Sequence, residues 1–186
     1  FASQAQDPLT DLQLSARDKS FAYQLHLTSS RPLVLQGDRG FSQKSEEGQA
    51  SYYYSQPFFQ ASGTLQIDGQ IYTVSGPAWL DREWSSQPLT ANQTGWDWFS
   101  LQLADGRELM LFRLRTKPGR ANPENKPENR YGILIEQDGS SRVLSPESIV
   151  LTPGKTWRGP KGQDYPVQWQ LKAGDLKLRI KARQPN

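Results

Sequence analysis

Four indole rings, three carboxylates and one guanidinium fall within twenty residues of this 186-residue chain. They lie in two runs, Trp79-Leu80-Asp81-Arg82-Glu83-Trp84 and Gly95-Trp96-Asp97-Trp98-Phe99. Aromatic side chains around a few ionisable groups are typical of a cavity that binds an apolar ligand. Such surroundings can also favour the protonated form of a carboxyl group, which acid catalysis requires. The stretch therefore predicts a binding site or a catalytic site.

Strand geometry constrains how the carboxylates can act. Alternate side chains of an extended strand point to opposite faces, so Trp79, Asp81 and Glu83 are expected to share one face. The two carboxylates would then lie roughly 7 Å apart, and such a pair can divide into an acid and a base where their surroundings differ. The structural alternative is that both carboxylates pair with arginines of neighbouring strands.

Further aromatic residues add to the candidate site. Tyr52 and Tyr54 share one side of a tyrosine-rich segment, and their hydroxyls could orient a ligand or donate to a developing charge. Ordinary strand propensity explains a tyrosine run equally well. The face carrying Trp96 and Trp98 would line a cavity or pack against a second domain. The predicted catalytic residues are Asp81, Tyr52 and Tyr54, and the predicted ligand-binding residues are Trp79, Glu83, Trp84, Trp96 and Trp98.

The elements that position these residues are predicted to be β-strands. Apolar and polar residues alternate with a period of two, and no ten-residue stretch keeps a helical apolar stripe. Asp68-Gly69, Asp105-Gly106 and Asp138-Gly139 each separate two such runs. An Asp-Gly pair tolerates the positive φ angles of a two-residue hairpin turn. The sequence therefore predicts an all-β fold, an antiparallel meander, with a domain seam in the irregular segment 87–94.

Composition excludes several classes of function. The chain has no cysteine and one histidine, His26, so thiolate or histidine-rich metal centres and a Ser-His-Asp triad are not expected, and we expect no cofactor. The net charge is +3, and the basic residues between Lys172 and Arg183 alternate with apolar ones. This pattern indicates a solvated strand face rather than a nucleic-acid groove. No apolar run approaches the ~20 residues of a membrane span.

Several motifs together resemble a known family. Five segments carry the resemblance: 33–40, 50–55, 74–86, 95–99 and 108–115. The Trp-Leu-Asp-Arg-Glu-Trp block within 74–86 is the most distinctive. These segments resemble the AttH-like branch of the bacterial carotenoid-hydratase superfamily, whose members are lipocalin-like proteins often described as secreted hydrolases. The resemblance covers most of the chain.

The resemblance implies two consecutive lipocalin-like antiparallel β-barrels. On this comparison residues 1–90 form the C-terminal part of the first barrel and residues 91–186 the N-terminal part of the second. Both barrels would be incomplete in this chain. The resemblance also implies a periplasmic or extracellular protein, free or lipid-anchored, that acts with an ABC-type export system.

The resemblance further implies a candidate chemistry. Carotenoid hydratases add water to an isolated carbon–carbon double bond, and their proposed mechanism begins with protonation of the alkene by an aspartic acid. Asp81 falls at the matching position. The chain departs from the hydratases at Trp79, where they have tyrosine, and at Tyr52 and Tyr54, where a histidine and a tryptophan are expected.

Three hypotheses follow for this chain. The first is a lipocalin-like protein that binds a hydrophobic, lipid or isoprenoid-like molecule, and we rank it first because of the departures from the hydratases. The second is a hydratase or hydrolase with Asp81 as general acid and Tyr52 or Tyr54 orienting water or substrate. The third is purely structural, with tryptophans joining two barrels and carboxylates satisfying arginines.

Overall fold

The computed structural model describes residues 9–45, 48–86, 89–117 and 130–184. The regular structure of these residues is β-strand apart from one 3-10 turn, and every strand pair is antiparallel, as the alternating pattern predicts. The chain divides into two compact units. The first comprises Phe1–Gln43, Ala50–Pro88 and Glu136–Ser140, and the second comprises Lys44–Gln49, Leu89–Ile135 and Ser141–Asn186.

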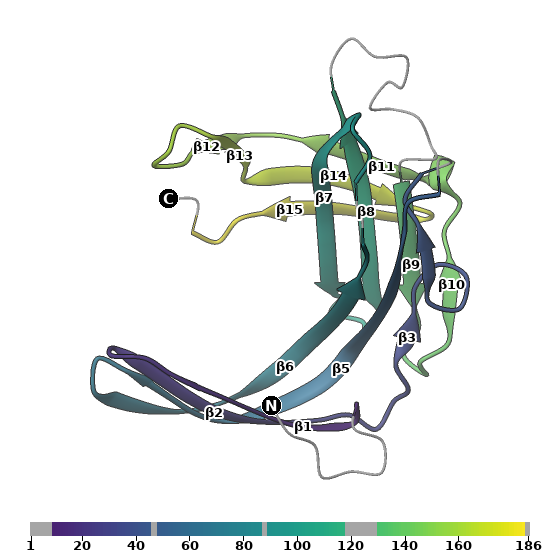
Figure 1. Ribbon diagram of the computed structural model, residues 1–186. Coiled ribbons are helices and arrows are strands. Elements are labelled where there is room, and N and C mark those ends of the chain that lie inside the picture. Colours follow the sequence, from purple (N-terminus) through teal and green to yellow (C-terminus); the bar gives the residue numbers. More distant parts are fainter. Residues whose placement is uncertain (1–8, 46–47, 87–88, 118–129, 185–186) are drawn as a thin grey trace. The chain divides into compact units, whose positions relative to one another are not determined.

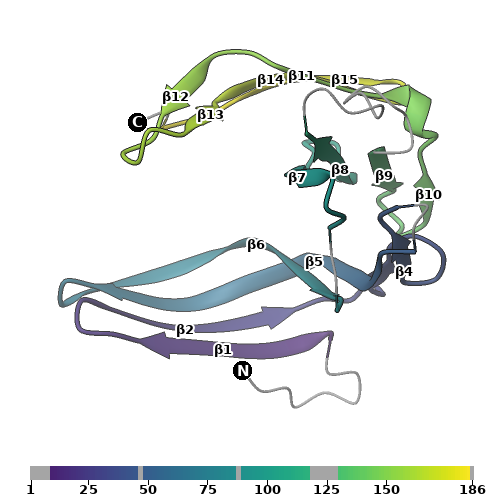
Figure 2. The same cartoon turned by 45° about the horizontal axis from the view of Figure 1, so that its top comes forward.

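The first unit is built on one long central strand. This is β5 (Ala50–Ile67), which pairs with all but one of the unit's other strands. Its partners are β2 (Phe21–Thr28), β3 (Val34–Leu35), β4 (Phe41–Gln43) and β6 (Gln70–Trp84), and β1 (Asp11–Arg17) pairs with β2. Figures 1 and 2 show β1, β2, β5 and β6 as neighbouring ribbons of this sheet.

The β5–β6 hairpin contains a bulge that changes its register. From the turn, the strands pair regularly as far as Phe59 with Ala78. The pairing then shifts by one residue, so that Gln56 faces Leu80, and Pro57 and Phe58 together lie opposite Trp79. Proline has no backbone N–H to donate to a ladder, which makes it a common residue at such a bulge.

The two faces of this sheet differ sharply in polarity. The face that we call the apolar face carries a core of Leu12, Leu27 and Phe59. Along the strands, the register adds these further apolar members: Leu14, Leu25, Leu35, Phe41, Tyr52, Tyr54, Ala61, Leu65, Val74, Ala78, Leu80 and Trp84. The opposite, polar face consists mainly of serine, threonine, glutamine and charged residues, among them His26, which pairs with Asp11 at 3.0 Å.

The second unit contains three smaller sheets (Figure 1). The largest has the order β10 (Ser141–Val143), β9 (Arg130–Ile135), β8 (Glu108–Thr116) and β7 (Gln93–Gln102). After the 3-10 turn η2 (Pro146–Ser148), a second sheet has the order β11 (Ile149–Pro153), β14 (Gln168–Ala173) and β15 (Leu176–Lys181). The hairpin of β12 (Thr156–Arg158) and β13 (Asp164–Pro166) is separate.

The core of the second unit joins its two larger sheets. Leu109, Leu111 and Leu134 of one sheet pack with Ile149 and Leu171 of the other. Strand β15 alternates between half-buried apolar and exposed basic side chains, which confirms the solvated basic face predicted for this segment.

The Asp-Gly pairs all lie in hairpin turns, but only one turn has two residues. Asp68 and Gly69 have φ angles of 48° and 84° between the paired residues Ile67 and Gln70. At Asp105-Gly106 and Asp138-Gly139 the loop has three residues, and only the glycine has a positive φ. The prediction of two-residue turns was therefore wrong at these two sites, because a type I turn followed by a left-handed glycine also fits the strand twist.

The aspartates of the two longer turns stabilise them. Hydrogen bonds from the side chain and backbone of Arg107 hold the pKa of Asp105 below its ordinary value. Hydrogen bonds from the hydroxyl and backbone of Ser140 lower the pKa of Asp138 in the same way.

An ion pair lies inside the second unit. Asp97 of β7 accepts hydrogen bonds from Arg113 of β8 at 2.6 and 3.2 Å, and both side chains are about 10% exposed. Arg113 also donates to the carbonyl of Leu151 at 3.1 Å, which links the two larger sheets. One carboxylate of the sequence cluster therefore has the structural role of satisfying an arginine.

We predict that Asp97→Ala destabilises the protein by about 3 kcal/mol, because it leaves the Arg113 guanidinium buried without its partner. Urea unfolding followed by circular dichroism would measure the change. Asp105→Ala, which removes an exposed carboxylate from Arg107, is the matched control and should lower the free energy of unfolding much less than Asp97→Ala does. Equal effects of the two substitutions would contradict the structural role of Asp97.

Candidate functional site

The bulge of the β5–β6 hairpin determines which side chains accompany Asp81. Beyond the bulge, Ser55 pairs with Asp81 and Tyr53 pairs with Glu83. Directly paired residues of antiparallel strands project from the same face. Asp81 and Glu83 therefore share the polar face with Ser55 and Tyr53. Strand β6 is unbroken, so Trp79, Asp81 and Glu83 lie on one face, as predicted.

Two hydroxyl groups hold one oxygen of the Asp81 carboxylate. Oδ1 accepts a hydrogen bond from Tyr53 Oη at 3.0 Å and another from Ser55 Oγ at 2.5 Å. Tyr53 and Ser55 are buried, and Asp81 is half-buried. Within the described part of the chain, no arginine or lysine pairs with Asp81, and Oδ2 accepts no hydrogen bond. The carboxyl group is thus oriented by neutral donors and keeps one oxygen available.

The second carboxylate lies in a similar but more open setting. Glu83 accepts a hydrogen bond from Ser51 Oγ at 2.5 Å, and its side chain is exposed while Ser51 is buried. The two carboxylates are therefore held by different serines in surroundings of different exposure, the condition under which paired carboxylates can take different roles.

Tyr52 and Tyr54, predicted as catalytic, lie on the opposite face from Asp81. They form an aromatic cluster, defined here as Phe41, Tyr52, Tyr54 and Trp84. The rings of Tyr52 and Trp84 stack with centroids 5.9 Å apart and planes at 28°, while Tyr54 meets Trp84 edge-on, also at 5.9 Å. The structure thus brings Tyr53, which the sequence reasoning missed, to the carboxylate in place of its neighbours.

The remaining tryptophans of the predicted site are separated. Trp79 is half-buried on the polar face, and its Nε1 is buried without a hydrogen-bond partner. Trp96 and Trp98 belong to the second unit, where they are paired with Leu114 and Phe112 and are 50% and 40% exposed. The four indoles of the sequence cluster therefore belong to different faces and to different units.

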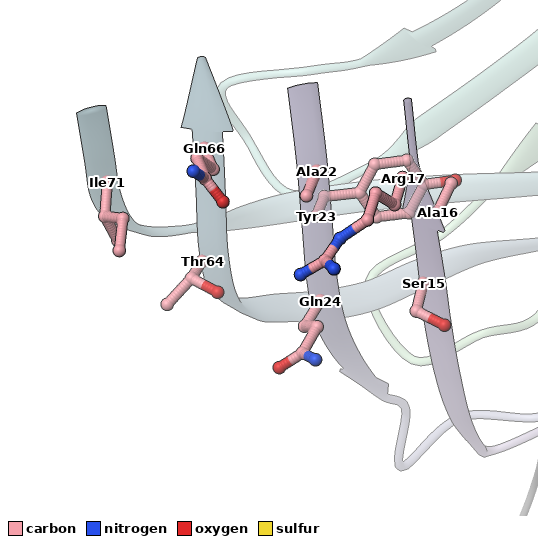
Figure 3. Close-up of a pocket in the computed structure, with 9 residues that line it drawn as sticks. All are labelled: Ser15, Ala16, Arg17, Ala22, Tyr23, Gln24, Thr64, Gln66 and Ile71. Carbon is pink, nitrogen blue, oxygen red and sulfur yellow. The ribbon is translucent and has the colours of Figure 1, made fainter. Parts of the chain in front are cut away.

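The first unit also has an open groove of about 400 Å³ (Figure 3). Side chains from four strands line it. The lining is mixed, with Arg17, Gln24, Thr64 and Gln66 beside apolar residues such as Tyr23. None of the predicted site residues lines this groove.

No group of three or more His, Cys, Asp or Glu side chains among the described residues could hold a metal ion. Nor does the described chain contain a helix with the length and apolar character needed to cross a membrane.

We predict that Tyr53→Phe lowers the free energy of unfolding by about 2 kcal/mol, because it removes a buried hydroxyl that donates to a carboxylate. Tyr52→Phe is the matched control one residue away, and it should change stability by less than about 0.5 kcal/mol because Tyr52 is 56% exposed. Urea unfolding of both variants measures the difference. A larger effect at Tyr52 would show that the hairpin register is wrong.

Comparisons with known proteins agree with this architecture. A crystal structure of an AttH protein from Nitrosomonas europaea is 35% identical to the chain and superposes with a TM-score of 0.83, covering 98% of this chain and 55% of that protein. Kievitone hydratase from Nectria haematococca is 20% identical to the chain and superposes with a TM-score of 0.76. The match covers 99% of this chain and 55% of the hydratase chain, and it shows a shared fold. The chain thus spans little more than half of each of these two proteins.

No protein with a curated function matches the chain. The profile of the AttH-like family matches residues 1–186, which is the full length of the sequence. This match, together with the lipocalin-like fold of the two similar structures, confirms the resemblance drawn from the sequence motifs. The chain belongs to the AttH-like family.

Proposed function

We propose that the protein binds a hydrophobic, lipid or isoprenoid-like molecule on the apolar face of its first unit. The observation that carries this proposal is the aromatic cluster, which extends the buried core of Leu12, Leu27 and Phe59 along the same sheet face. Phe41, Tyr52 and Trp84 are each about half exposed. Exposed apolar patches continuous with a core are typical of ligand or partner sites.

The chemistry of the aromatic cluster suits an apolar chain. The stacked rings of Tyr52 and Trp84 offer a flat surface, and Tyr54 supports Trp84 edge-on. Rings held by their neighbours lose little conformational entropy when a ligand covers them. On the strands of this face the amide and charged side chains are Gln43, Gln56, Gln70 and Arg82, and none of them belongs to the aromatic cluster, so a ligand on the cluster would meet mainly carbon atoms.

Membership of the AttH-like family supports two further proposals for the whole protein. One is a role as an accessory to an ABC-type export system, and the other is a location in the periplasm or outside the cell. Both remain predictions, as do the ligand-binding roles of Trp79, Glu83, Trp96 and Trp98.

We predict that Trp84→Ala weakens binding of farnesol, used as an isoprenoid probe, by roughly 30-fold, the effect of removing a central aromatic contact. Isothermal titration of the intact protein measures the affinity. Trp157→Ala is a matched control, because Trp157 makes a similar pair with Tyr165, with centroids 5.9 Å apart and planes at 31°. Equal losses in both variants, or no farnesol binding by the unaltered protein, would refute the proposal.

A second candidate function is hydration or hydrolysis with Asp81 as general acid. The observation that favours it is the Asp81 carboxyl group, fixed through Oδ1 by Tyr53 and Ser55 while Oδ2 is available to carry and donate a proton. For hydration, Oδ2–H would give its proton to one alkene carbon, and water would attack the other and lose a proton. The fold shared with kievitone hydratase is consistent with this candidate. Tyr53, rather than Tyr52 or Tyr54, would position the acid.

We predict that Asp81→Asn abolishes any such turnover while leaving the affinity for farnesol methyl ether within about twofold, because the ether has no hydroxyl to donate and Asp81 and the aromatic cluster lie on opposite faces. Incubation of farnesol with the intact protein in ¹⁸O-labelled water, followed by mass spectrometry, would detect the hydrated product. Glu83→Gln, two residues along the same face, is the control. Unchanged product formation by Asp81→Asn would exclude Asp81 as the acid. If Trp84→Ala and Asp81→Asn lowered only stability, the structural hypothesis would be favoured.

A further inference from the structure

A buried glutamine adjoins the Asp81 carboxylate. Gln36 is 0% exposed, and its Nε2 donates to Ser55 Oγ at 2.8 Å. Ser55 Oγ in turn donates to Asp81 Oδ1 at 2.5 Å. The hydroxyl of Ser55 therefore connects Gln36 to Asp81, although the two residues lie 45 positions apart in the sequence.

The backbone fixes Gln36 in this place. Its N–H donates to the carbonyl of Tyr53 at 3.0 Å, and its carbonyl accepts from Gly40 at 2.9 Å. The next residue, Gly37, has a φ of 66°, and a Cβ there would lie 2.2 Å from the carbonyl oxygen of Phe41. Only glycine fits this tight turn, so the amide cannot relax by moving its own backbone.

Two buried polar atoms on the polar face of this sheet lack the hydrogen bonds that buried groups require. Gln36 Oε1 is a buried acceptor without a donor, and Trp79 Nε1 is a buried donor without an acceptor on the face that carries Asp81. Buried polar atoms of folded proteins are nearly always satisfied, since an unpaired one is costly. Asp81 Oδ2 is a second available acceptor in the described region.

We infer that Gln36 Oε1 and Asp81 Oδ2 bind one hydroxyl group, with the indole N–H of Trp79 donating to its oxygen. A hydroxyl both donates and accepts, which is the combination that these atoms need. Asp81 and Glu83 would repel an anion. An ammonium group has no lone pair, so it could not accept a hydrogen bond from the Trp79 indole N–H. The hydroxyl belongs to an alcohol or to water. This polar-face site goes beyond the binding proposed for the apolar face. It shares Asp81 Oδ2 with the second candidate function but requires no turnover.

Geraniol and its methyl ether test the inference, because only the alcohol can donate. The intact protein should bind geraniol about tenfold more tightly than the ether, and Gln36→Leu should remove that preference. Gln60→Leu, which changes an exposed glutamine on the polar face of β5, should keep it. The preference should also persist in Trp84→Ala, which separates this site from binding on the apolar face.

A crystal structure distinguishes the two sources of the hydroxyl. If alcohol and ether bind alike, a water within hydrogen-bond distance of Gln36 Oε1 and Asp81 Oδ2, lost in Gln36→Leu, would support the inference with water as the bound group. Absence of both the preference and this water would overturn it. If Gln36→Leu does not fold, the side-chain amide NMR signals of Gln36 in the unaltered protein should shift with geraniol and not with the ether where the bound group is an alcohol. Unchanged signals, together with absence of the water from the crystal structure of the unaltered protein, would equally overturn the inference.

Discussion

The register of the β5–β6 hairpin is the constraint on which the candidate site depends. A regular hairpin counted from the turn at Asp68-Gly69 would pair Asp81 with Gln56 and place Tyr52 and Tyr54 on the face of the carboxylate. The bulge at Pro57 and Phe58 moves the pairing by one residue. Because side chains alternate with a period of two, this single extra residue exchanges the faces of the whole end of the strand.

This exchange separates two kinds of chemistry that lie side by side in the sequence. Trp84 joins Tyr52 and Tyr54 on the apolar face, where the rings continue a leucine-rich core. Asp81 joins Tyr53 and Ser55 on the polar face, where hydroxyl groups orient it. One β-hairpin can thus present an apolar surface and a hydrogen-bonded carboxyl group without either disturbing the other.

The second unit shows the other role that a carboxylate can take among aromatic residues. Asp97 lies between two exposed tryptophans in the sequence, yet it faces inward and pairs with Arg113, which also binds a carbonyl of the next sheet. Asp81 and Asp97 differ in their partners: hydroxyl groups hold one, and a guanidinium holds the other. A half-buried carboxylate without a cation is the more promising functional residue.

The sequence alone determined the all-β fold, the hairpin positions, the common face of Trp79, Asp81 and Glu83, and the family, because these depend on local alternation, turn chemistry and motifs. It did not determine the length of two of the hairpin turns or the tyrosine beside Asp81, since both depend on the number of residues in a turn or bulge. The placement of Gln36 beside Ser55 came only from the tertiary structure, because β3 reaches β5 through pairing between distant segments. Periodicity tells which residues share a face of one strand, whereas register between strands tells which of them meet.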